Sequence, residues 1–337
     1  MINHDFKAYV VEEGDDGGFY GEIQDRTISE LPPGDVIVRV QYSSLNYKDA
    51  LSATGNRAVT KAYPHTPGID AAGIVEESDT ESIPQGTPVI VTSYDLGMNT
   101  PGGFGQYIRV PADWVVPLPT GLSLRESMIF GTAGFTAGLS LLKLTASVKP
   151  EHGPIVVTGA TGGVGSVAVA ILSKLGYAVS AVSGKSNAMD FLGPLGVDKV
   201  IGRETFLENS HRPLLKPLWA GAVDTVGGKP LATAIKSTHP LGVVTCCGNA
   251  ASPELPITVF PFILRGVSLM GVNSQSCPMN IRKNAWEKLS HDWKFDGLER
   301  ICQGISLSEL SGRIETILKG RMLGRTVVRL DGADVSG

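Results

Sequence analysis

A glycine-rich turn between a short apolar run and an amphipathic segment limits the possible folds of this chain more than any other feature. The run at 155–158 reads Ile-Val-Val-Thr, and glycines follow at positions 159, 162 and 165. Apolar residues then recur at helical spacing from Val164 to Leu175, and Gly176 stands where a left-handed helix cap is expected. The pattern predicts a strand, a tight turn and a helix whose first free amides can bind a pyrophosphate.

The spacing of these glycines differs from the usual G-x-G-x-x-G, and glycine turns without a ligand are common. The loop alone therefore leaves two interpretations open, a nucleotide site and an ordinary turn. In a nucleotide site, the contacts would come from the start of the predicted helix, at Thr161, Gly162, Gly163, Val164 and Gly165.

Composition and charge exclude several classes of protein. The chain has 337 residues, enough for two domains, with 42% hydrophobic and 18% charged residues. Its net charge of -4 gives no reason to expect a nucleic-acid partner. No run reaches the roughly 18 uninterrupted apolar residues of a membrane span, and residues 1–7 carry no signal-peptide core. We therefore expect neither a nucleic-acid nor a membrane partner.

The cysteines and histidines favour a metal-free protein of the cytoplasm. None of the six histidines is paired at metal-ligand spacing. The four cysteines form no C-x-x-C pair and no disulfide framework, which suits a reducing compartment. They are Cys246, Cys247, Cys277 and Cys302.

Short apolar runs separated by turns fill the chain up to about Ser127. Five of them have strand character, at 6–13, 35–42, 87–93, 106–110 and 114–118. Segments rich in proline and glycine, such as Pro32-Pro33-Gly34, separate them. Few helical patterns interrupt this part, which predicts a compact, mostly antiparallel β domain.

From position 131 on, helical and strand patterns alternate. Helices are predicted at 131–144, 164–175, 188–192 and 231–237, and strands at 155–158, 178–182, 199–201, 222–226, 243–246 and 267–272. Such alternation is typical of a parallel sheet covered on both faces, so we expect a central, doubly wound α/β fold. Helices at 282–293 and 307–319 follow, and a last strand at 325–330 is well placed to rejoin the first β domain.

The end of the second predicted strand of this sheet indicates which dinucleotide would bind. An acidic residue there accepts from the ribose 2′-hydroxyl of NAD and repels a 2′-phosphate. The segment 181–185 has no carboxylate and instead carries the Ser183 hydroxyl and the Lys185 ammonium. We therefore predict NADPH over NADH. The alternative is a solvated loop with an ordinary surface lysine.

Two further strand ends carry small residues, which would leave room for the ribose and nicotinamide. They are the segments 222–227 and 246–249, and the second contributes Cys247 and Gly248 as candidate contacts. Ordinary tight turns are the alternative, and Asp224 could equally cap a following turn.

On these motifs the chain resembles the medium-chain dehydrogenase/reductase superfamily, in its zinc-free quinone-oxidoreductase-like branch. The resemblance covers nearly the whole length, and the combination of motifs is specific where the glycine loop alone is not. The motifs are Leu45-Asn46-Tyr47-Lys48-Asp49, Pro67-Gly68-Ile69-Asp70-Ala71-Ala72-Gly73, the loop at 158–166, Asp224-Thr225-Val226-Gly227 and Gly324-Arg325-Thr326-Val327-Val328.

Within that branch, three stretches resemble the acryloyl-CoA reductase group, at 43–51, 181–185 and 260–267. The resemblance implies NADPH-dependent reduction of acryloyl-CoA to propanoyl-CoA. It also implies an α/β chain with two domains: a GroES-like β domain, here 1–128 and 274–337, and a doubly wound Rossmann domain, here 129–273. A homodimer joined through the Rossmann sheets is implied as well.

Zinc-dependent relatives carry Gly-His-Glu where this chain has Gly68-Ile69-Asp70, and they carry a catalytic cysteine early in the chain. No cysteine here precedes Cys246. Both zinc sites are therefore predicted to be absent. Without a Lewis acid simple alcohol oxidation is disfavoured, because the alkoxide lacks its stabiliser, whereas reduction of a conjugated double bond needs less.

For such a reduction, hydride would attack the β-carbon of an unsaturated thioester, and donors must face the oxygen where charge develops. Asn46 is the first candidate, as a donor to that oxygen or to the nicotinamide ribose, and a turn asparagine is its alternative. Asp49 would face the same side and orient Asn46 or the cofactor, or simply cap a helix. Tyr47 is a candidate for the α-proton, with ordinary packing as its alternative.

Other candidates follow from the resemblance. Arg325 would contact the cofactor phosphate or the substrate, or be a surface residue at a strand start. Thr132 and Thr136 would touch the nicotinamide carboxamide, or pack between helices. Asn273 and Ser274, after the last strand of the sheet, would lie beside the nicotinamide.

A basic rim for CoA phosphates is one interpretation of Lys48, Arg57 and Lys61, and ordinary solvated side chains are the alternative. Two other functions share these motifs. One is an NADPH-dependent quinone or enone reductase, and the other is an NADPH-binding protein without catalytic activity.

Overall fold

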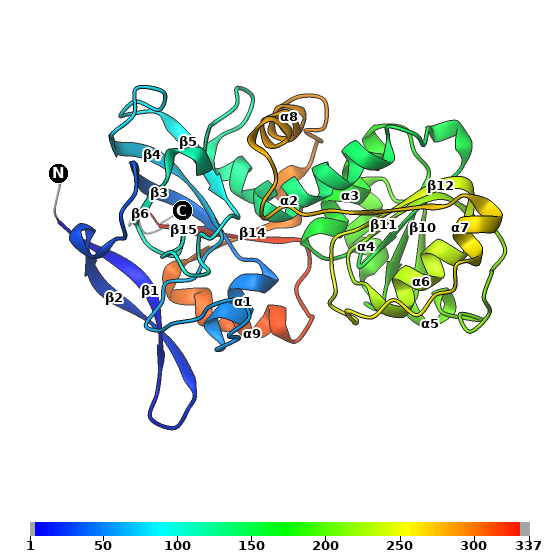
Figure 1. Cartoon of the computed structure of the whole chain (residues 1–337), viewed down its shortest axis with the longest axis horizontal. Helices are drawn as coiled ribbons and strands as arrows, with labels where there is room; N and C mark the ends of the chain where they lie inside the picture. Colours follow the sequence, from blue (N-terminus) through cyan, green and yellow to red (C-terminus); the bar gives the residue numbers. More distant parts are fainter. Residues whose placement is uncertain (1–3, 331–337) are drawn as a thin grey trace. The chain divides into compact units, whose positions relative to one another are not determined.

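The computed structural model describes residues 4–330, which divide into two compact units (Figure 1). The first unit comprises the chain up to Thr132, Gln275–Lys283 and the residues from Leu298 on. The second comprises Ala133–Ser274 and Asn284–Gly297. Two helices contribute to both units, α2 (Leu124–Leu144) and α8 (Met279–Ser290).

The first unit is built mainly on antiparallel strands, and β14 and β15 form a parallel pair at one edge of its main sheet. The main sheet has the order β14-β15-β3-β4-β5-β7, with β6 also pairing β3, and β1 and β2 form a separate hairpin. Two helices, α1 (Tyr47–Ala53) and α9 (Leu310–Leu318), belong to it. The strands are β1 (Asp5–Glu13), β2 (Phe19–Thr27), β3 (Val36–Ser44), β4 (Asp70–Ser78), β5 (Pro88–Thr92), β6 (Tyr107–Val110), β7 (Val115–Pro117), β14 (Cys302–Ser306) and β15 (Arg325–Arg329).

Two features of this sheet confirm the sequence pattern. Strand β3 buries Val36, Val38 and Val40 in one core cluster and Ile37 in another, as the two-residue period of a strand requires. The C-terminal strand β15 pairs antiparallel with β3, with Val327 opposite Ser44. The end of the chain therefore completes the N-terminal sheet, as predicted.

The second unit is a doubly wound parallel sheet. Its six strands have the order β10-β9-β8-β11-β12-β13, and all neighbours are parallel. The order reverses between β8 and β11, which is where ligands bind in sheets of this kind. Its strands are β8 (Ile155–Thr158), β9 (Val179–Ser183), β10 (Lys199–Gly202), β11 (Trp219–Asp224), β12 (Thr238–Cys246) and β13 (Ser268–Gly271).

Helices connect these strands and pack against the sheet (Figure 1). They are α3 (Gly163–Lys174), α4 (Ala188–Leu192), α5 (Arg203–Phe206), α6 (Gly228–Lys236) and α7 (Phe260–Arg265). The predicted fold class, a GroES-like β domain with a Rossmann domain, is confirmed. Strands β2, β4 and β14 and helices α5 and α7 were not predicted, because their patterns are short or interrupted by polar residues.

The predicted helix at 131–144 differs from the observed one at its start. Helix α2 begins at Leu124 and is broken at Gly131, whose φ of 50° and ψ of -158° are not helical. By length and composition α2 could cross a membrane, but 83% of its most apolar window is buried, as in a core helix. A Cβ at position 131 would lie 2.5 Å from both Asp70 Oδ2 and Ser44 Oγ. The glycine therefore lets the backbone approach a group of buried polar side chains.

Candidate active site

The glycine turn follows β8, as the sequence predicts. Gly159 has a φ of 59°, and a Cβ at Gly165 would lie 2.4 Å from the Gly159 carbonyl oxygen. A side chain at either position would strain or block this close approach. The two glycines thus hold the turn against the first residues of α3.

Helix α3 presents its free amides just beyond this turn. Gly162 is the N-cap, and its carbonyl accepts the first intrahelical bond, from the Ser166 amide at 2.9 Å. The amides of Gly163, Val164 and Gly165 therefore precede the first donor of the helix. Amides in this position, with the positive end of the helix dipole, suit a pyrophosphate. The backbone cradle thus fits a dinucleotide.

Cations gather at the end of the neighbouring strand β9. The Ser183 hydroxyl lies 3.3 Å from Thr161 Oγ1 and accepts a bond from the Lys185 amide at 3.2 Å. Burial lowers the pKa of the Lys185 ammonium, and the positive charge of Arg203 lowers it further. A Cβ at Gly184 would lie 3.2 Å from Arg203 Nη2.

Sequence reasoning missed Arg203, although a signal for it exists. Strand β10 pairs with β9 so that Gly202 stands opposite Ser183. The first residue after β10 therefore comes beside the first residue after β9. Reading the ends of adjacent parallel strands together would have paired Arg203 with the Ser183–Lys185 segment.

Asp224, at the end of β11, has a structural role in the second unit. Its carboxylate is fully buried, and it accepts bonds from Thr158 Oγ1 at 2.6 Å and from the Gly227 amide at 2.7 Å. It caps the following turn, which was one of the two interpretations. The Cys247 Sγ lies 3.3 Å from the Asp224 carbonyl oxygen, and burial raises the pKa of this thiol to about 12. Cys247 is therefore an unreactive thiol.

Of the remaining candidates of the second unit, one lies within a helix and the others follow strands. Thr136 is buried in α2, where its carbonyl accepts from Ser140 Oγ at 2.9 Å. Gly248 follows β12, and a Cβ there would lie 2.0 Å from the Thr225 carbonyl oxygen. Asn273 and Ser274 follow β13, as predicted.

In the first unit, Asp70 is the centre of a buried polar cluster. Its side chain is fully buried at the start of β4. Oδ2 accepts from Ser44 Oγ at 2.5 Å and from Asn46 Nδ2 at 2.8 Å. Oδ1 accepts from Thr132 Oγ1 at 2.6 Å, and the Thr132 amide also donates to the carboxylate. We call Ser44, Asn46, Asp49, Asp70, Thr132 and Arg325 the Asp70 cluster.

Arg325 balances the charge of Asp70. Its side chain is 1% exposed, and Nη2 lies 3.8 Å from Asp70 Oδ2. Nε donates to the Ile129 carbonyl at 2.9 Å, Nη2 to Ser44 Oγ at 2.7 Å and Nη1 to Asn46 Oδ1 at 3.2 Å. The alternative of a surface residue at a strand start is wrong, because the guanidinium is enclosed by protein.

Asn46 and Asp49 begin helix α1. Asn46 is the N-cap, and its backbone N–H donates to Asp49 Oδ2 at 2.7 Å. Its side-chain Nδ2 donates to Asp70 and also lies 3.2 Å from the Ser44 carbonyl and 3.3 Å from Asp49 Oδ2. Asp49 therefore both caps the helix and orients Asn46. Burial, reinforced by the charge of Asp70, raises the pKa of Asp49 to about 7.

Tyr47 and the three basic residues considered for CoA lie outside the Asp70 cluster. The Tyr47 side chain is 45% exposed at the first position of α1. Lys48 Nζ donates to Gln275 Oε1 at 2.8 Å, and burial lowers the pKa of this ammonium. Arg57 pairs with Glu13 at 2.5 Å over the rings of Phe19 and Tyr63, and Lys61 is exposed.

Two family models match the chain. Residues 32–120 match the family described as Alcohol dehydrogenase GroES-like domain, and residues 163–291 match the one described as Zinc-binding dehydrogenase. Together with the sheet order of the second unit, these matches define the class: the chain belongs to the medium-chain dehydrogenase/reductase superfamily.

Particular relatives narrow this class. The chain is 43% identical to "Acrylyl-CoA reductase AcuI" of Ruegeria pomeroyi, covering 96% of this chain and 98% of that one. It is 46% identical to "Putative quinone oxidoreductase YhfP" of Bacillus subtilis, covering 90% and 94%. The yhdH oxidoreductase of Salmonella enterica, solved with NADP, superposes with a TM-score of 0.94 at 43% identity, covering 96% and 100%. YhfP itself, solved with NAD bound, has a TM-score of 0.94 at 43% identity, covering 97% and 100%.

The family name mentions zinc, but the described residues offer no zinc site. Within residues 4–330, no three His, Cys, Asp or Glu side chains are grouped to hold a metal ion. In the Gly68-Ile69-Asp70 motif, the Asp70 carboxylate instead faces the Arg325 guanidinium. That the protein works without zinc stays a prediction.

Proposed function

We propose that this protein reduces acryloyl-CoA to propanoyl-CoA with NADPH. The observation that carries the proposal is the 43% identity to an acrylyl-CoA reductase over 96% of the chain. In this proposal the backbone cradle after β8 would hold the dinucleotide, and the Asp70 cluster would be the polar site of the first unit. The GroES-like catalytic domain would comprise 1–128 and 274–337, and the NADPH domain 129–273.

For the cofactor, Ser183, Lys185 and Arg203 form the proposed 2′-phosphate site. A hydroxyl and two cations meet there, and no acidic residue stands in the segment 181–185. Charge-assisted hydrogen bonds to a phosphate are about twice as strong as neutral ones. This supports NADPH over NADH, although one relative was solved with NADP and another with NAD.

When bound, the nicotinamide supplies hydride to the β-carbon of the thioester. The chain's own residues hold the groups around it. Thr132 Oγ1 donates to Asp70 Oδ1 at 2.6 Å and lies 2.9 Å from Ser93 Oγ, and we propose that the nicotinamide carboxamide also contacts this hydroxyl. Thr136, Asn273, Ser274, Cys247 and Gly248 are the further contacts that we propose for the cofactor.

The geometry of Asn46 favours a positioning role. Both amide hydrogens have protein acceptors within 3.3 Å, and its Oδ1 accepts from Arg325. Donation to a thioester oxygen would therefore need one of these bonds to break. We propose that Asn46 and Arg325 position the start of α1, where Tyr47 presents a phenol that can deliver the α-proton.

The protein is also proposed to be a cytoplasmic homodimer joined through its second unit. Strand β13 is the edge of the parallel sheet, and unpaired edges invite pairing with a second copy. Apolar side chains are exposed beside it: Leu241 at 79%, Ile263 at 68% and Leu264 at 64%. Ile263→Lys should convert dimer to monomer in analytical ultracentrifugation; a native monomer would contradict this proposal.

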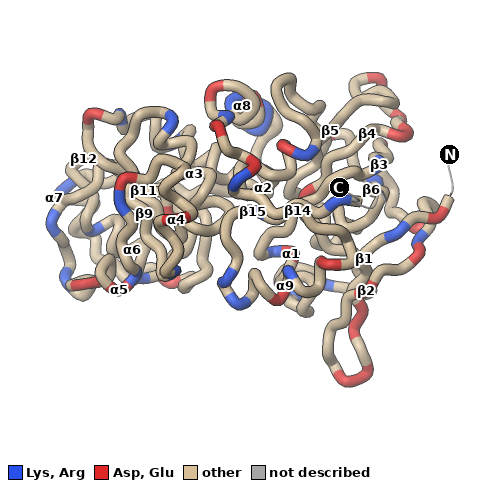
Figure 2. The backbone as a smooth tube through the Cα atoms, turned by 180° about the vertical axis from the view of Figure 1, so that it is seen from behind, with Lys and Arg blue, Asp and Glu red and all other residues tan. Residues whose placement is uncertain are grey.

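Neither a nucleic-acid nor a membrane partner is part of the proposal. Segments of Lys and Arg and of Asp and Glu are scattered over the whole traced backbone (Figure 2). None of the four cysteines forms a disulfide bond, which suits a reducing cytoplasm.

The second candidate is an NADPH-dependent quinone or enone reductase, favoured by the name of the YhfP relative. The two functions separate by substrate. NADPH oxidation should be followed with acryloyl-CoA, crotonyl-CoA and a small quinone in parallel. We expect saturation by acryloyl-CoA at the lowest concentration, and a preference for the quinone would favour the second candidate. NADPH binding without turnover of any of the three would indicate a protein without catalytic activity.

Asn46→Ala tests the mechanism. We expect turnover of acryloyl-CoA to fall far more than NADPH affinity, because the variant loosens the start of α1 and leaves the backbone cradle intact. Equal losses in both would make Asn46 a cofactor-positioning residue.

A further inference from the structure

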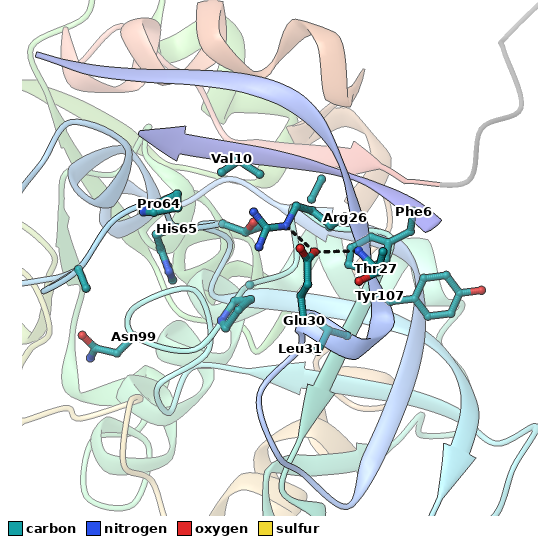
Figure 3. A pocket seen from close by; sticks show the side chains of 16 residues that line it. Phe6, Val10, Arg26, Thr27, Glu30, Leu31, Pro64, His65, Asn99 and Tyr107 are labelled. Atoms are coloured by element: carbon teal, nitrogen blue, oxygen red, sulfur yellow. Dashed lines mark hydrogen bonds and ion pairs between the residues drawn. The ribbon is translucent and has the colours of Figure 1, made fainter. Parts of the chain in front are cut away.

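The first unit contains a pocket that none of the predicted site residues lines. It measures about 170 Å³ and lies wholly within the first unit (Figure 3). Its walls come from β1, from the end of β2 with the short 3-10 helix η1 (Ile28–Glu30), and from the loops at 62–66 and 99–105. The Asp70 cluster contributes no residue to it.

One buried polar atom of this pocket has no partner. His65 is 6% exposed, and its Nε2 has no hydrogen-bond partner among the described residues. In Figure 3 its ring extends from beside Pro64 into the space between Asn99 and Arg26. A buried donor or acceptor without a partner is energetically unfavourable. A ligand that forms a hydrogen bond with it therefore gains more binding free energy than from the same bond at an exposed site.

The structure also determines what kind of bond His65 can make. Its backbone is held by two bonds to Val11, of 2.7 and 2.9 Å, so the ring cannot turn away with the loop. Burial lowers the pKa of the ring, and a bond to the backbone of Gly97 opposes this only in part. The ring is therefore neutral at neutral pH. The Gly97 bond raises the pKa, so the ring is its donor, and we assign the unpartnered Nε2 as the acceptor of the neutral ring.

The rest of the lining has apolar walls and balanced charge. Phe6, Val10, Leu31 and Tyr107 form the apolar part. Arg26 and Glu30 line the other part, and they pair with each other at 3.0 Å. The pocket thus offers no uncompensated charge, and burying an ion in it would carry a desolvation penalty without a counter-charge. A neutral ligand fits this lining better than an anion or a cation.

The volume limits the size of the ligand. An engineered protein cavity of about 150 Å³ binds benzene. A pocket of about 170 Å³ can therefore hold one aromatic ring with a small substituent.

From the volume, the apolar walls and the unbonded acceptor, we propose that this pocket binds a small neutral aromatic alcohol of the phenol class, whose hydroxyl donates to His65 Nε2. The ring of the ligand lies against the apolar wall that includes Phe6 and Leu31. The proposal concerns a site apart from the reductase chemistry and holds whether or not the proposed function does.

Phenol and anisole test the proposal on the full-length protein. The two have nearly the same shape, but anisole has no hydroxyl to donate. Binding should be measured for both by isothermal titration calorimetry or ligand-observed NMR. We expect phenol to bind roughly tenfold more tightly than anisole, the effect of one net neutral hydrogen bond. Equal affinities, or no saturable binding of phenol, would overturn the proposal.

Two variants locate the site. His65→Leu removes the acceptor and should make the affinities for phenol and anisole equal. Ala62→Phe places a large side chain on an exposed residue that lines the pocket, so it leaves the core untouched and should weaken both ligands at least tenfold. His211→Leu, at an exposed histidine outside this unit, is the matched control and should bind as the native protein does. Unchanged phenol binding in Ala62→Phe would place the ligand elsewhere and refute the assignment, even if His65→Leu fails to fold.

Discussion

The glycine cradle of the second unit and the Asp70 cluster of the first unit are both polar sites, but they are held in opposite ways. The cradle is made of backbone, and its shape depends on the absence of side chains at Gly159 and Gly165. The Asp70 cluster is made of buried side chains, joined by charge and by hydrogen bonds that cross between β3, β4, α1 and β15. The first kind of site is sensitive to added volume and the second to lost charge.

Neutralising Asp70 should have the largest effect, because it breaks the cluster at its centre. Asp70→Asn leaves the Arg325 guanidinium, 1% exposed, without its counter-charge. Removing one partner of a buried ion pair costs about 3–5 kcal/mol, and urea unfolding should show a loss of this size. The matched control is Glu76→Gln, which removes the partly exposed partner of Arg39 at 3.1 Å and should cost under about 1 kcal/mol. Equal losses in the two variants would mean that the buried pair contributes no more than the surface pair.

Gly165→Ala should break the cradle. The new Cβ would lie 2.4 Å from the Gly159 carbonyl oxygen, which is backbone and cannot turn aside. Overpacking of this kind costs about 1–3 kcal/mol of the free energy of unfolding. We expect the free energy of NADPH binding to weaken by at least the same amount. The control Gly202→Ala meets no atom within 4 Å and should change neither. NADPH titration by fluorescence and thermal unfolding would measure both; unchanged NADPH affinity in Gly165→Ala would count against the cradle.

The pH dependence of stability should distinguish the two sites, because only the Asp70 cluster contains a carboxyl group with a strongly raised pKa. The folded state raises the pKa of Asp49 from 3.8 to about 7, so this group binds its proton more tightly when folded. Its contribution to stability is therefore full below about pH 4 and is lost as pH rises through 7.

Asp49→Asn should remove this dependence. The native protein should lose about 2–3 kcal/mol of its free energy of unfolding between pH 5 and pH 8, relative to the variant. Urea unfolding at both pH values measures this difference. A difference between the two proteins that is the same at pH 5 and pH 8 would show that Asp49 is ionised throughout.

Removing a cation beside the cradle should have the smallest effect. Lys185→Ala and Arg203→Ala should each weaken NADPH binding about tenfold and leave NADH binding unchanged, because only the 2′-phosphate would lose a contact. Lys199→Ala, at an exposed lysine at the start of β10, serves as the control. If NADPH affinity falls in Arg203→Ala but not in Lys185→Ala, then Arg203 alone reads the phosphate.

The sequence predicted the backbone cradle well and the Asp70 cluster only in part. The glycine loop, its strand and its helix were predicted almost to the residue, since every part lies within about twenty positions of sequence. For the Asp70 cluster, the sequence indicated Asn46, Asp49, Thr132 and Arg325 separately. It did not indicate that they share Asp70, which is 24 positions from Asn46 and 62 from Thr132.

Arg203 and His65 illustrate what local patterns cannot show. The arginine comes beside Gly184 through the pairing of β9 with β10, and the unbonded His65 nitrogen follows from the way the 62–66 loop pairs with Val11. Neither residue stands in a motif. Both depend on which residues of neighbouring strands stand opposite each other. The sequence predicts the type of sheet but not this register.

The sequence by itself determined the fold class, the two-part organisation and the position of the glycine turn, because apolar periodicity and the backbone freedom of glycine act over a few neighbouring residues. Only the tertiary structure decided that Arg325 is enclosed and opposite Asp70, that Asn46 has given its hydrogens to protein acceptors, and that the Asp49 carboxyl group has a pKa near neutrality. Burial and charge depend on residues brought together from distant parts of the chain, and desolvation exists only once they are assembled.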